Sequence, residues 1–450
     1  MTKMFGTNGV RGVVNKDMNV QLALQMGKAV GAIFPGNIAI ANDTRDSCAM
    51  IVSAVSAGLM SVGCNVFKLG MMPTPSLQYY VKTHDGISCG IMITASHNPP
   101  EFNGIKVIAP DGTEASPEQE AAIENKYDET IAPVQWEKTG YSEEISGADI
   151  DYVDAVIKKL DVDLIKNAGL TVVLDCSNGA SCFTSPLLMK RIGVRAVTLN
   201  GTPQGEFPGH PSEPTEDHLT DLKKLVVDVG ANLGIAHDGD ADRCVFVDEK
   251  GNYVPGDKTL AILGKRLASV KRGSTVVTPV ATSSVVEENV ASVKGKVVYT
   301  AVGSPIVARA MMDDGAVFGG EENGGLIFPD HQYCRDGAMA AGRMLECIVG
   351  DGPLSKQVDE LPKFYMEKRK IVCPNELKDS VVKYIDAHTK GVKKSRRDGI
   401  KLLFDNGWVL VRPSGTEPIF RVYSESKYQN DAVTLADTYV TMVNGFLNSA

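Results

Sequence analysis

Short apolar segments recur along the chain, and each is followed by a polar loop and an amphipathic stretch. The segments NIAIANDTRDS, LTVVLDCSNGASC and STVVTPVATSS begin near residues 37, 170 and 274. Strands that are apolar throughout and alternate with helices indicate parallel sheets covered on both faces, with ligand-binding loops at the carboxyl ends of the strands. Their spacing of about 100 to 130 residues predicts three similar α/β domains.

The chain after Lys370 has a different pattern. The segment IVCPNELKDSVVKYIDAH precedes a strand-rich stretch, KLLFDNGWVLVRPSGTEPIFRVYSES, and a final helix near residues 429–448. This order predicts a smaller α+β domain. Because a single core stops growing at about 250–300 residues, the chain needs several domains. We predict four, with a polar linker before the second: residues 1–150, 151–250, 251–365 and 366–450.

Composition and charge narrow the class of protein. The chain has 450 residues, 43% of them hydrophobic and 22% charged, as expected of a soluble globular protein. A net charge of −9 argues against a basic face for nucleic acid or anionic lipid, so an anionic ligand must meet a local cluster. No apolar stretch approaches the roughly 18 residues of a membrane-spanning helix, and the start MTKMFGTNGVRG lacks the apolar core of a signal peptide. We expect a cytoplasmic protein whose nine cysteines, which form no C-x-x-C pair, are buried and reduced.

Three aspartates in AHDGDADRCVFVDEKG carry the sharpest chemical signal. Asp238, Asp240 and Asp242 alternate with small residues, and carboxylates this close repel one another unless a cation joins them. The spacing matches the start of an EF-hand, with Glu249 at the twelfth position, but Arg243 stands where an EF-hand needs glycine, and a β-hairpin follows. A tight turn with three carboxylates favours Mg²⁺, which keeps water and phosphate oxygens among its ligands. The alternative is a solvated acidic turn, and the apolar flanks NLGIA and CVFV argue against it.

The segment WVLVRPSGTEPIFRVY offers groups suited to a phosphate dianion. Arg412, Ser414, Gly415 and Thr416 supply a guanidinium fork, two hydroxyls and free backbone N–H groups, and Arg421 could add a second fork. A hairpin turn that contains an arginine without a ligand stays open as the alternative.

The glycine-rich segment AVFGGEENGGLIF could bind sugar hydroxyls. Glu321, Glu322 and Asn323 place carboxylate and amide groups on an open loop. A β-turn with a solvated acidic tip is the alternative. At the N-terminus, FGTNGVRG places Arg11 among small residues, where its charge can approach a ligand. Lys106, in FNGIKVI, is an ordinary solvated lysine when considered alone.

Ser96 lies in ITASHNPPEFNGIK, after an apolar strand and before a turn. A nucleophilic serine needs a base within hydrogen-bonding reach. His97 is adjacent, but neighbouring side chains in extended or turn conformations point to different sides, so we do not expect it to be that base. His331, in FPDHQYCRDG with Arg335 and Asp336, could lie near the ligand-binding cleft, but a surface position after a strand is what we expect.

Taken together, TASHNPPEFNGIK, DGDADR, GEENGG and RPSGTEP, in this order over essentially the whole chain, resemble the α-D-phosphohexomutase superfamily. That superfamily includes phosphoglucomutase, phosphomannomutase and phosphoglucosamine mutase. The start FGTNGVRG is more similar to phosphoglucosamine mutases than to bacterial phosphomannomutases. The GEENGG loop resembles archaeal members of the superfamily. The resemblance implies three mixed-sheet α/β domains and a smaller C-terminal α+β domain, with the active site in a central cleft. It also implies hexose phosphates as partners and a monomer or homodimer.

The resemblance implies roles for the residues singled out above. Ser96 would be the phosphoryl donor and acceptor, and an oxygen of its phosphoserine would bind Mg²⁺ together with the three aspartates. Arg11 and Arg243 would stabilise charge on the phosphoryl group in transfer. Lys106 would be the general acid/base, with a pKa lowered by cationic neighbours and partial desolvation. His97 would position other groups at most.

The substrate groups are assigned in the same way. Glu321 and Asn323 would hold sugar hydroxyls, and the RPSGTEP loop would hold the phosphate that is not reacting. A sugar 1,6-bisphosphate would form and turn over in the site before its second phosphate returns to the serine. Many members have Ser in place of Asn323 and His in place of Gly325, which leaves the preferred sugar open among glucosamine, mannose, glucose and N-acetylglucosamine phosphates.

Two other classes of protein stay open. A non-catalytic protein that binds sugar phosphate or Ca²⁺ would not need Ser96. A serine hydrolase or sugar phosphatase would let water finish the reaction, but the chain lacks a G-x-S-x-G elbow and a separate histidine with a claim to be the base.

Overall fold

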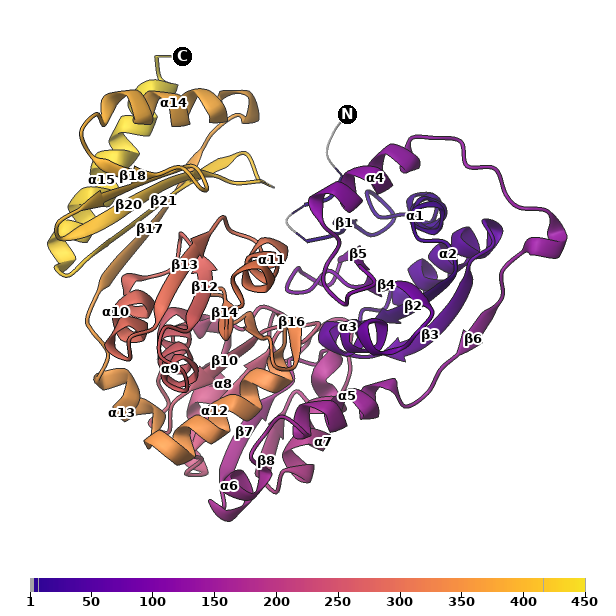
Figure 1. The fold of residues 1–450 in the computed structure, drawn as a ribbon, viewed down its shortest axis with the longest axis horizontal. Helices are drawn as coiled ribbons and strands as arrows, with labels where there is room; N and C mark the ends of the chain where they lie inside the picture. Colours follow the sequence, from indigo (N-terminus) through magenta and orange to yellow (C-terminus); the bar gives the residue numbers. More distant parts are fainter. Residues whose placement is uncertain (1–3, 7, 416, 450) are drawn as a thin grey trace. The chain divides into compact units, whose positions relative to one another are not determined.

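The computed structural model describes residues 4–6, 8–415 and 417–449. The chain divides into two compact units, one of Met1–Thr259 with Glu322–Asp359 and the other of Leu260–Glu321 with Glu360–Ala450. Sheets covered by helices make up both units (Figure 1). Within the described ranges, no helix has the length and apolar character needed to cross a membrane.

The first sheet has six strands in the order β1-β5-β4-β2-β3-β6. Strands β4, β2, β3 and β6 run parallel to one another, whereas β5 is antiparallel to both β4 and β1. The strands are β1 (Val10–Val13), β2 (Asn37–Asn42), β3 (Asn65–Met71), β4 (Ile87–Ile93), β5 (Phe102–Ile108) and β6 (Ser142–Glu144).

Helices cover this sheet on both faces. Helices α1 and α2 lie on one face with α4 beside α1, and α3 lies on the other (Figure 1). Ile40 and Ile91 pack into the first core, while Ala41 and Met92 pack into the second. Because both faces are buried, the strands are apolar throughout, as the sequence pattern predicts. The helices are α1 (Val20–Ile33), α2 (Cys48–Ser61), α3 (Thr74–Thr83) and α4 (Pro117–Tyr127).

The topology of the first sheet gathers polar residues at one edge. Strands β2 and β4 are parallel neighbours, so their carboxyl ends lie side by side. The loop after β2 begins at Asp43, and the loop after β4 begins at Thr94 and contains Ser96. Strand β5 places Lys106 beside β4, and β1 places Arg11 beside β5.

The second sheet has five strands in the order β11-β10-β9-β7-β8. Strand β7 is parallel to β8 and β9, and β10 is antiparallel to β9 and β11. The aspartate triplet forms the turn between β9 and β10, and the hairpin predicted after it is formed by β10 and β11. The elements are α5 (Ala148–Ile157), α6 (Val162–Asn167), β7 (Thr171–Asp175), α7 (Thr184–Arg191), β8 (Arg195–Leu199), α8 (Thr220–Asp228), β9 (Leu233–His237), β10 (Cys244–Val247) and β11 (Tyr253–Val254).

The third domain again mixes parallel and antiparallel strands. Strand β12 is parallel to β13 and β14, and β15 and β16 form an antiparallel pair. Its elements are α9 (Gly256–Ser269), β12 (Thr275–Pro279), α10 (Ser284–Ser292), β13 (Lys296–Thr300), α11 (Ser304–Asp314), β14 (Phe318–Gly320), β15 (Leu326–Phe328), β16 (Gln332–Arg335), α12 (Gly337–Asp351) and α13 (Leu354–Asp359).

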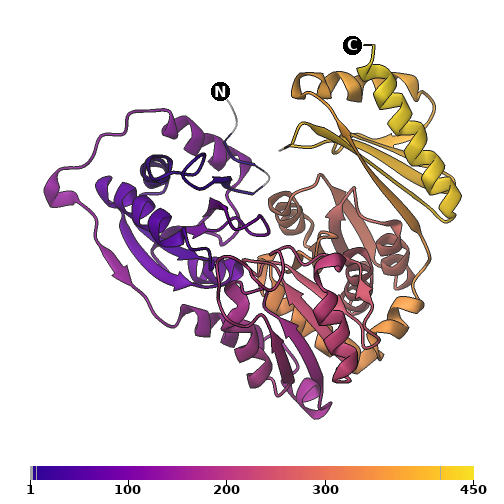
Figure 2. The same cartoon turned by 180° about the vertical axis from the view of Figure 1, so that it is seen from behind.

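The C-terminal domain is a fully antiparallel sheet in the order β17-β21-β20-β19-β18. Helix α15 lies along this sheet, as Figure 2 shows from behind. The elements are β17 (Tyr365–Val372), α14 (Lys378–His388), β18 (Lys393–Ser395), β19 (Ile400–Phe404), β20 (Gly407–Pro413), β21 (Ile419–Ser426) and α15 (Gln429–Leu447). The predicted fold class, three mixed-sheet α/β domains and a smaller α+β domain, is confirmed, and the boundaries near residues 150, 250 and 365 stay predictions. All nine cysteines are buried free thiols, as expected.

Candidate active site

Ser96 is fully buried in the turn after β4 and has a left-handed backbone conformation, with φ of 53°. Its backbone N–H donates to Thr94 Oγ1 at 2.8 Å, and its hydroxyl donates to Asp238 Oδ2 at 2.9 Å. A serine at positive φ is strained by about 1–3 kcal/mol and persists only when its surroundings hold it there. Here that conformation directs Oγ onto the aspartate triplet.

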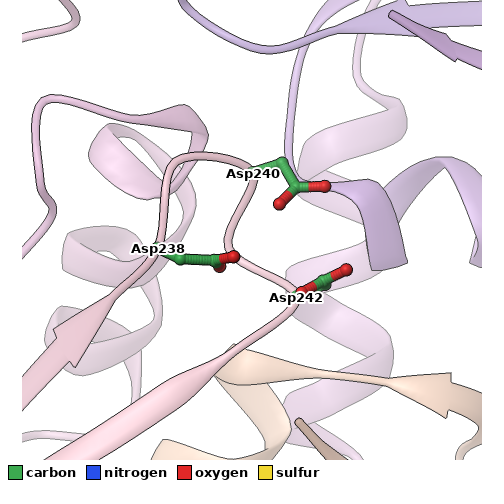
Figure 3. Close-up of side chains that lie close together, drawn as sticks. All are labelled: Asp238, Asp240 and Asp242. Atoms are coloured by element: carbon green, nitrogen blue, oxygen red, sulfur yellow. The ribbon is translucent and has the colours of Figure 1, made fainter. Parts of the chain in front are cut away.

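The three aspartates are buried, and their carboxylates face a common space (Figure 3). One oxygen from each lies within 4.8 Å of those of the other two. Burial, followed by the charges of Asp242 and Asp240, raises the pKa of Asp238 to about 8. Asp240 Oδ1 and Asp242 Oδ1 have no hydrogen-bond partner among the described residues. Buried carboxylate oxygens that repel one another and lack donors fit a hard divalent cation such as Mg²⁺.

Lys106 lies against this triplet rather than in solvent. Its side chain is 1% exposed, and Nζ is 2.6 Å from Asp240 Oδ2 and 3.2 Å from Asp242 Oδ2. Burial lowers the pKa of the ammonium, but the two carboxylates outweigh burial and the net shift is upward. The expectation of a lowered pKa is therefore wrong for this arrangement, because the fold places anions next to Lys106 along with the cationic neighbours.

Arg11, in β1, and Arg243, in the turn before β10, both approach the loop that carries Ser96. Arg11 Nη1 donates to Ala95 O at 3.1 Å and to Asn98 Oδ1 at 2.8 Å. Arg243 Nε lies 3.7 Å from Asp238 Oδ2, and Nη2 lies 3.1 Å from His97 Nδ1. Both guanidinium groups thus contact the loops that carry the serine and the aspartates, where they could bind an anionic group on the serine.

His97 lies closer to the serine than expected, with Nδ1 3.4 Å from Ser96 Oγ. The left-handed turn at Ser96 brings the two neighbouring side chains to the same side. The Arg243 guanidinium, burial and Arg11 lower the pKa of His97 to about 2, so the imidazole is neutral. Because its Nδ1 accepts a hydrogen bond from Arg243, His97 is poorly placed to act as a base.

Several residues of this site lie outside the motifs that the sequence analysis identified. Thr74, the first residue of α3, donates to Asp240 Oδ2 at 2.5 Å through its hydroxyl and to Asp240 O at 3.0 Å through its N–H. Arg335 Nη2 donates to Asp242 Oδ2 at 2.6 Å and lies 3.8 Å from Glu114 Oε1. Arg45 follows β2 and donates hydrogen bonds to backbone carbonyls of the loop that carries Ser96. The place of Arg45 at the carboxyl end of an apolar strand is the signal that could have identified it.

His331 is not on the surface. It is 6% exposed, stacks on the Tyr79 ring at 5.4 Å and has Nε2 3.4 Å from Asp336 Oδ2. The same carboxylate group accepts the Tyr152 hydroxyl at 2.5 Å and caps α12 by accepting from Met339 N–H. The expectation of a surface histidine is wrong because the segment after β15 is covered by α3 and α5.

The two residues proposed to bind sugar hydroxyls differ in exposure. Glu321 is buried, and its Oε1 accepts a hydrogen bond from Gly303 N–H at 3.1 Å in the second unit. Asn323 is exposed, and its Oδ1 accepts from Gly325 N–H at 3.1 Å. Their roles toward a sugar stay predictions.

The residues proposed to bind phosphate lie in the second unit, in β20, in β21 and in the turn between these two strands. Arg412 and Arg421 are cross-strand partners, and Arg412 Nε donates to Asp398 Oδ2 at 2.8 Å. Ser414 is buried, with its hydroxyl accepting from Glu417 N–H. Gly415 is exposed, and Thr416 lies outside the described residues. Arg421 is ion-paired with the Glu417 side chain at 2.9 Å.

Comparison with known proteins covers nearly the whole chain. Four family models match in succession, described as Phosphoglucomutase/phosphomannomutase alpha/beta/alpha domains I, II and III and the C-terminal domain. They match residues 2–133, 150–251, 255–365 and 370–440.

Individual relatives agree with the family models. A Thermococcus kodakarensis protein named "Phosphoglucomutase/phosphomannomutase" is 40% identical over 443 residues, which are 96% of each chain. A Methanopyrus kandleri protein named "Probable phosphoglucosamine mutase" is 40% identical over 98% of each chain. The crystal structure of a phosphoglucomutase/phosphomannomutase family protein from Burkholderia thailandensis has the same fold, with a TM-score of 0.88 and 23% identity over 99% of this chain and 98% of that one. The predicted membership is confirmed, and the chain belongs to the phosphoglucomutase/phosphomannomutase family.

Proposed function

We propose that Ser96 carries a phosphoryl group and exchanges it with the 1- and 6-positions of a hexose phosphate. The chain is a phosphohexomutase by family, and mutases of this kind are isomerases. A sugar phosphatase or a non-catalytic binding protein is not favoured. The observation that carries the proposal is the 2.9 Å hydrogen bond from Ser96 Oγ to Asp238, beside two further buried carboxylates.

Asp238, Asp240 and Asp242 would hold Mg²⁺ together with an oxygen of phospho-Ser96. Bound there, Mg²⁺ would neutralise charge on the phosphoryl oxygens and on the aspartates. The two carboxylate oxygens that lack donors support this assignment.

The other charged residues of the site support two further roles, proton transfer by Lys106 and charge stabilisation by Arg11 and Arg243. Lys106 would take the proton from the attacking sugar hydroxyl and return it when the reaction reverses. Its pKa is raised by carboxylates, and once these are neutralised burial would lower it toward that of a base. Arg11 and Arg243 would stabilise the phosphoryl group in transfer, since most of the catalysis of phosphoryl transfer is positioning and electrostatics.

A mutase needs a second phosphate site as well as the serine. We assign the phosphate that is not reacting to Arg412, Ser414, Gly415 and Arg421, with Thr416 outside the described residues. Glu321 and Asn323 would hold hydroxyls in both orientations of a sugar 1,6-bisphosphate intermediate. The substrates proposed are glucosamine, mannose and glucose phosphates, which the names of the two archaeal relatives support.

The test is a panel of hexose 1-phosphates assayed for 6-phosphate formation with Mg²⁺ and catalytic sugar 1,6-bisphosphate. We expect isomerisation without net release of inorganic phosphate, and loss of isomerisation in Ser96→Ala. Ser53→Ala is the matched control, because Ser53 is exposed on α2 and its hydroxyl donates to Ala49 O within the same helix. Isomerisation by Ser96→Ala, or phosphate release in place of isomerisation by the wild type, would overturn the proposal.

A further inference from the structure

Arg45 is buried in the loop after β2 and reaches into the serine loop, residues 96–102. Its Nη1 donates to Pro99 O at 2.6 Å and Phe102 O at 2.9 Å. Its Nη2 donates to Ser96 O at 2.9 Å and Asn98 O at 2.5 Å. One guanidinium thus satisfies four carbonyls of a single turn, which five donors in a rigid plane make possible.

The same guanidinium is also connected to the backbone N–H of Ser96, through Asp43 and Thr94. Arg45 Nε donates to Asp43 Oδ2 at 3.2 Å. That oxygen also accepts the Thr94 hydroxyl at 2.5 Å, and Thr94 Oγ1 accepts the Ser96 N–H at 2.8 Å. Both peptide groups that define the left-handed φ of Ser96 are therefore tied to Arg45, the carbonyl directly and the N–H through two side chains.

Residues of the second domain contact the same arginine and the loop that it binds. The Phe207 ring lies with its centroid 5.0 Å from the Arg45 guanidinium, within range of a cation–π interaction. Ser212 Oγ donates to Asn98 O at 3.1 Å and lies 3.4 Å from Ser96 O. The guanidinium is thus enclosed, and its charge is balanced by Asp43, by carbonyl dipoles and by an aromatic face.

We propose that Arg45 is a positioning residue for phosphoryl transfer, which holds Ser96 in its strained conformation so that Oγ lies at the aspartate triplet. The inference rests on the proposed function of Ser96. A buried cation is not needed for stability alone, because apolar residues of similar volume often stabilise as well. What an apolar residue cannot do is bond four carbonyls and hold a strained turn.

The test compares Arg45→Lys, Arg45→Ala and Arg343→Met with the wild type. Lys keeps the charge but offers one nitrogen, and Ala leaves space for added guanidinium. Arg343 is the matched control, because it is 15% exposed and ion-paired with Asp330 and Glu346, outside the serine loop. We expect both Arg45 variants to lose about 100-fold in kcat with little change in KM, and millimolar guanidinium to restore kcat in Arg45→Ala.

Thermal unfolding and the rate of Ser96 phosphorylation by glucose 1,6-bisphosphate, followed by intact mass, accompany the kinetics. If Arg45→Lys folds and keeps wild-type kcat, or if Arg343→Met loses kcat equally at equal loss of Tm, the inference is overturned. If guanidinium restores Tm but not kcat, a purely structural role replaces it. Absence of isomerisation by the wild type itself would overturn the proposed function instead, so the two failures are distinguishable.

Discussion

Gly239 separates Asp238 from Asp240 and packs directly on the serine loop, which makes Gly239→Ala a sharp perturbation of the site. A Cβ at this position would lie 2.6 Å from Ser96 O, which is 0.8 Å less than the 3.4 Å at which ordinary van der Waals contact begins. It would also lie 3.2 Å from Ser212 Cβ. Since Ser96 O belongs to the backbone and accepts from Arg45, it cannot swing aside as a flexible side chain would.

The size of the effect follows from this overlap. If the serine loop takes up the whole 0.8 Å, the 2.9 Å distance between Ser96 Oγ and Asp238 Oδ2 rises to about 3.7 Å, beyond hydrogen bonding. A misplacement near 1 Å costs about 100-fold in rate, which is about 2.7 kcal/mol in the activation barrier. We expect Gly239→Ala to lose about this much in kcat.

The assay is conversion of hexose 1-phosphate to 6-phosphate, with thermal unfolding measured on the same samples. Gly445→Ala is the control, because a Cβ there meets nothing within 4 Å and the residue lies in α15. Alanine should stabilise that helix by up to about 1 kcal/mol and leave kcat unchanged. If Gly239→Ala keeps kcat within about threefold of wild type, a barrier change below 1 kcal/mol, the reasoning from overlap is refuted.

Three further predictions concern other parts of the molecule. Lys106→Met should lower kcat by about 10²–10⁴-fold as a general acid–base is lost, and steady-state kinetics showing a smaller fall would remove Lys106 from that role. Asp398→Asn should raise KM about tenfold by releasing Arg412, from the roughly 1.5 kcal/mol of a hydrogen bond between charged groups, and an unchanged KM would show that Arg412 needs no anchor. Burial lowers the pKa of His210, but its contacts with Asp175 outweigh burial, so the net shift is upward. A group with a raised pKa in the folded state contributes its full stabilisation of the fold at pH values below its unfolded pKa of about 6.5. That stabilisation is lost as the pH rises through the folded-state pKa. The Tm of the wild type should therefore fall relative to that of His210→Gln as the pH rises from about 6.5 through the folded-state pKa, and parallel curves would contradict this.

The positions of the strands and the clustering of the three aspartates are both predicted from the sequence, and both depend on local patterns. Apolar runs mark the strands, and β2, β7 and β12 all begin within a residue or so of the predicted segments. The aspartate triplet is recognisable because three like charges within five residues are unfavourable without a cation, whatever the fold. These signals need no knowledge of which segments meet.

Arg45 shows what local signals omit. Its partners are four backbone carbonyls, one carboxylate and an aromatic ring, and a carbonyl has no sequence signature. The same limit explains the wrong pKa direction for Lys106, because the register of β5 decides whether Nζ meets carboxylates or only cations. In both cases the neighbours come from distant segments of the chain, which the pattern of strands and loops does not identify.

The charge of the whole site also could not be predicted from the sequence composition. A net charge of −9 argues against a basic surface, yet four cationic side chains converge on three carboxylates around Ser96, namely Arg11, Lys106, Arg243 and Arg335. Three of the four are buried, so their charge does not form a basic surface. A dianionic phosphoryl group and a divalent cation that enter together would leave the local charge balance unchanged. In the proposed function, the phosphoryl group on Ser96 and the Mg²⁺ at the aspartates would therefore offset each other's charge in this buried site.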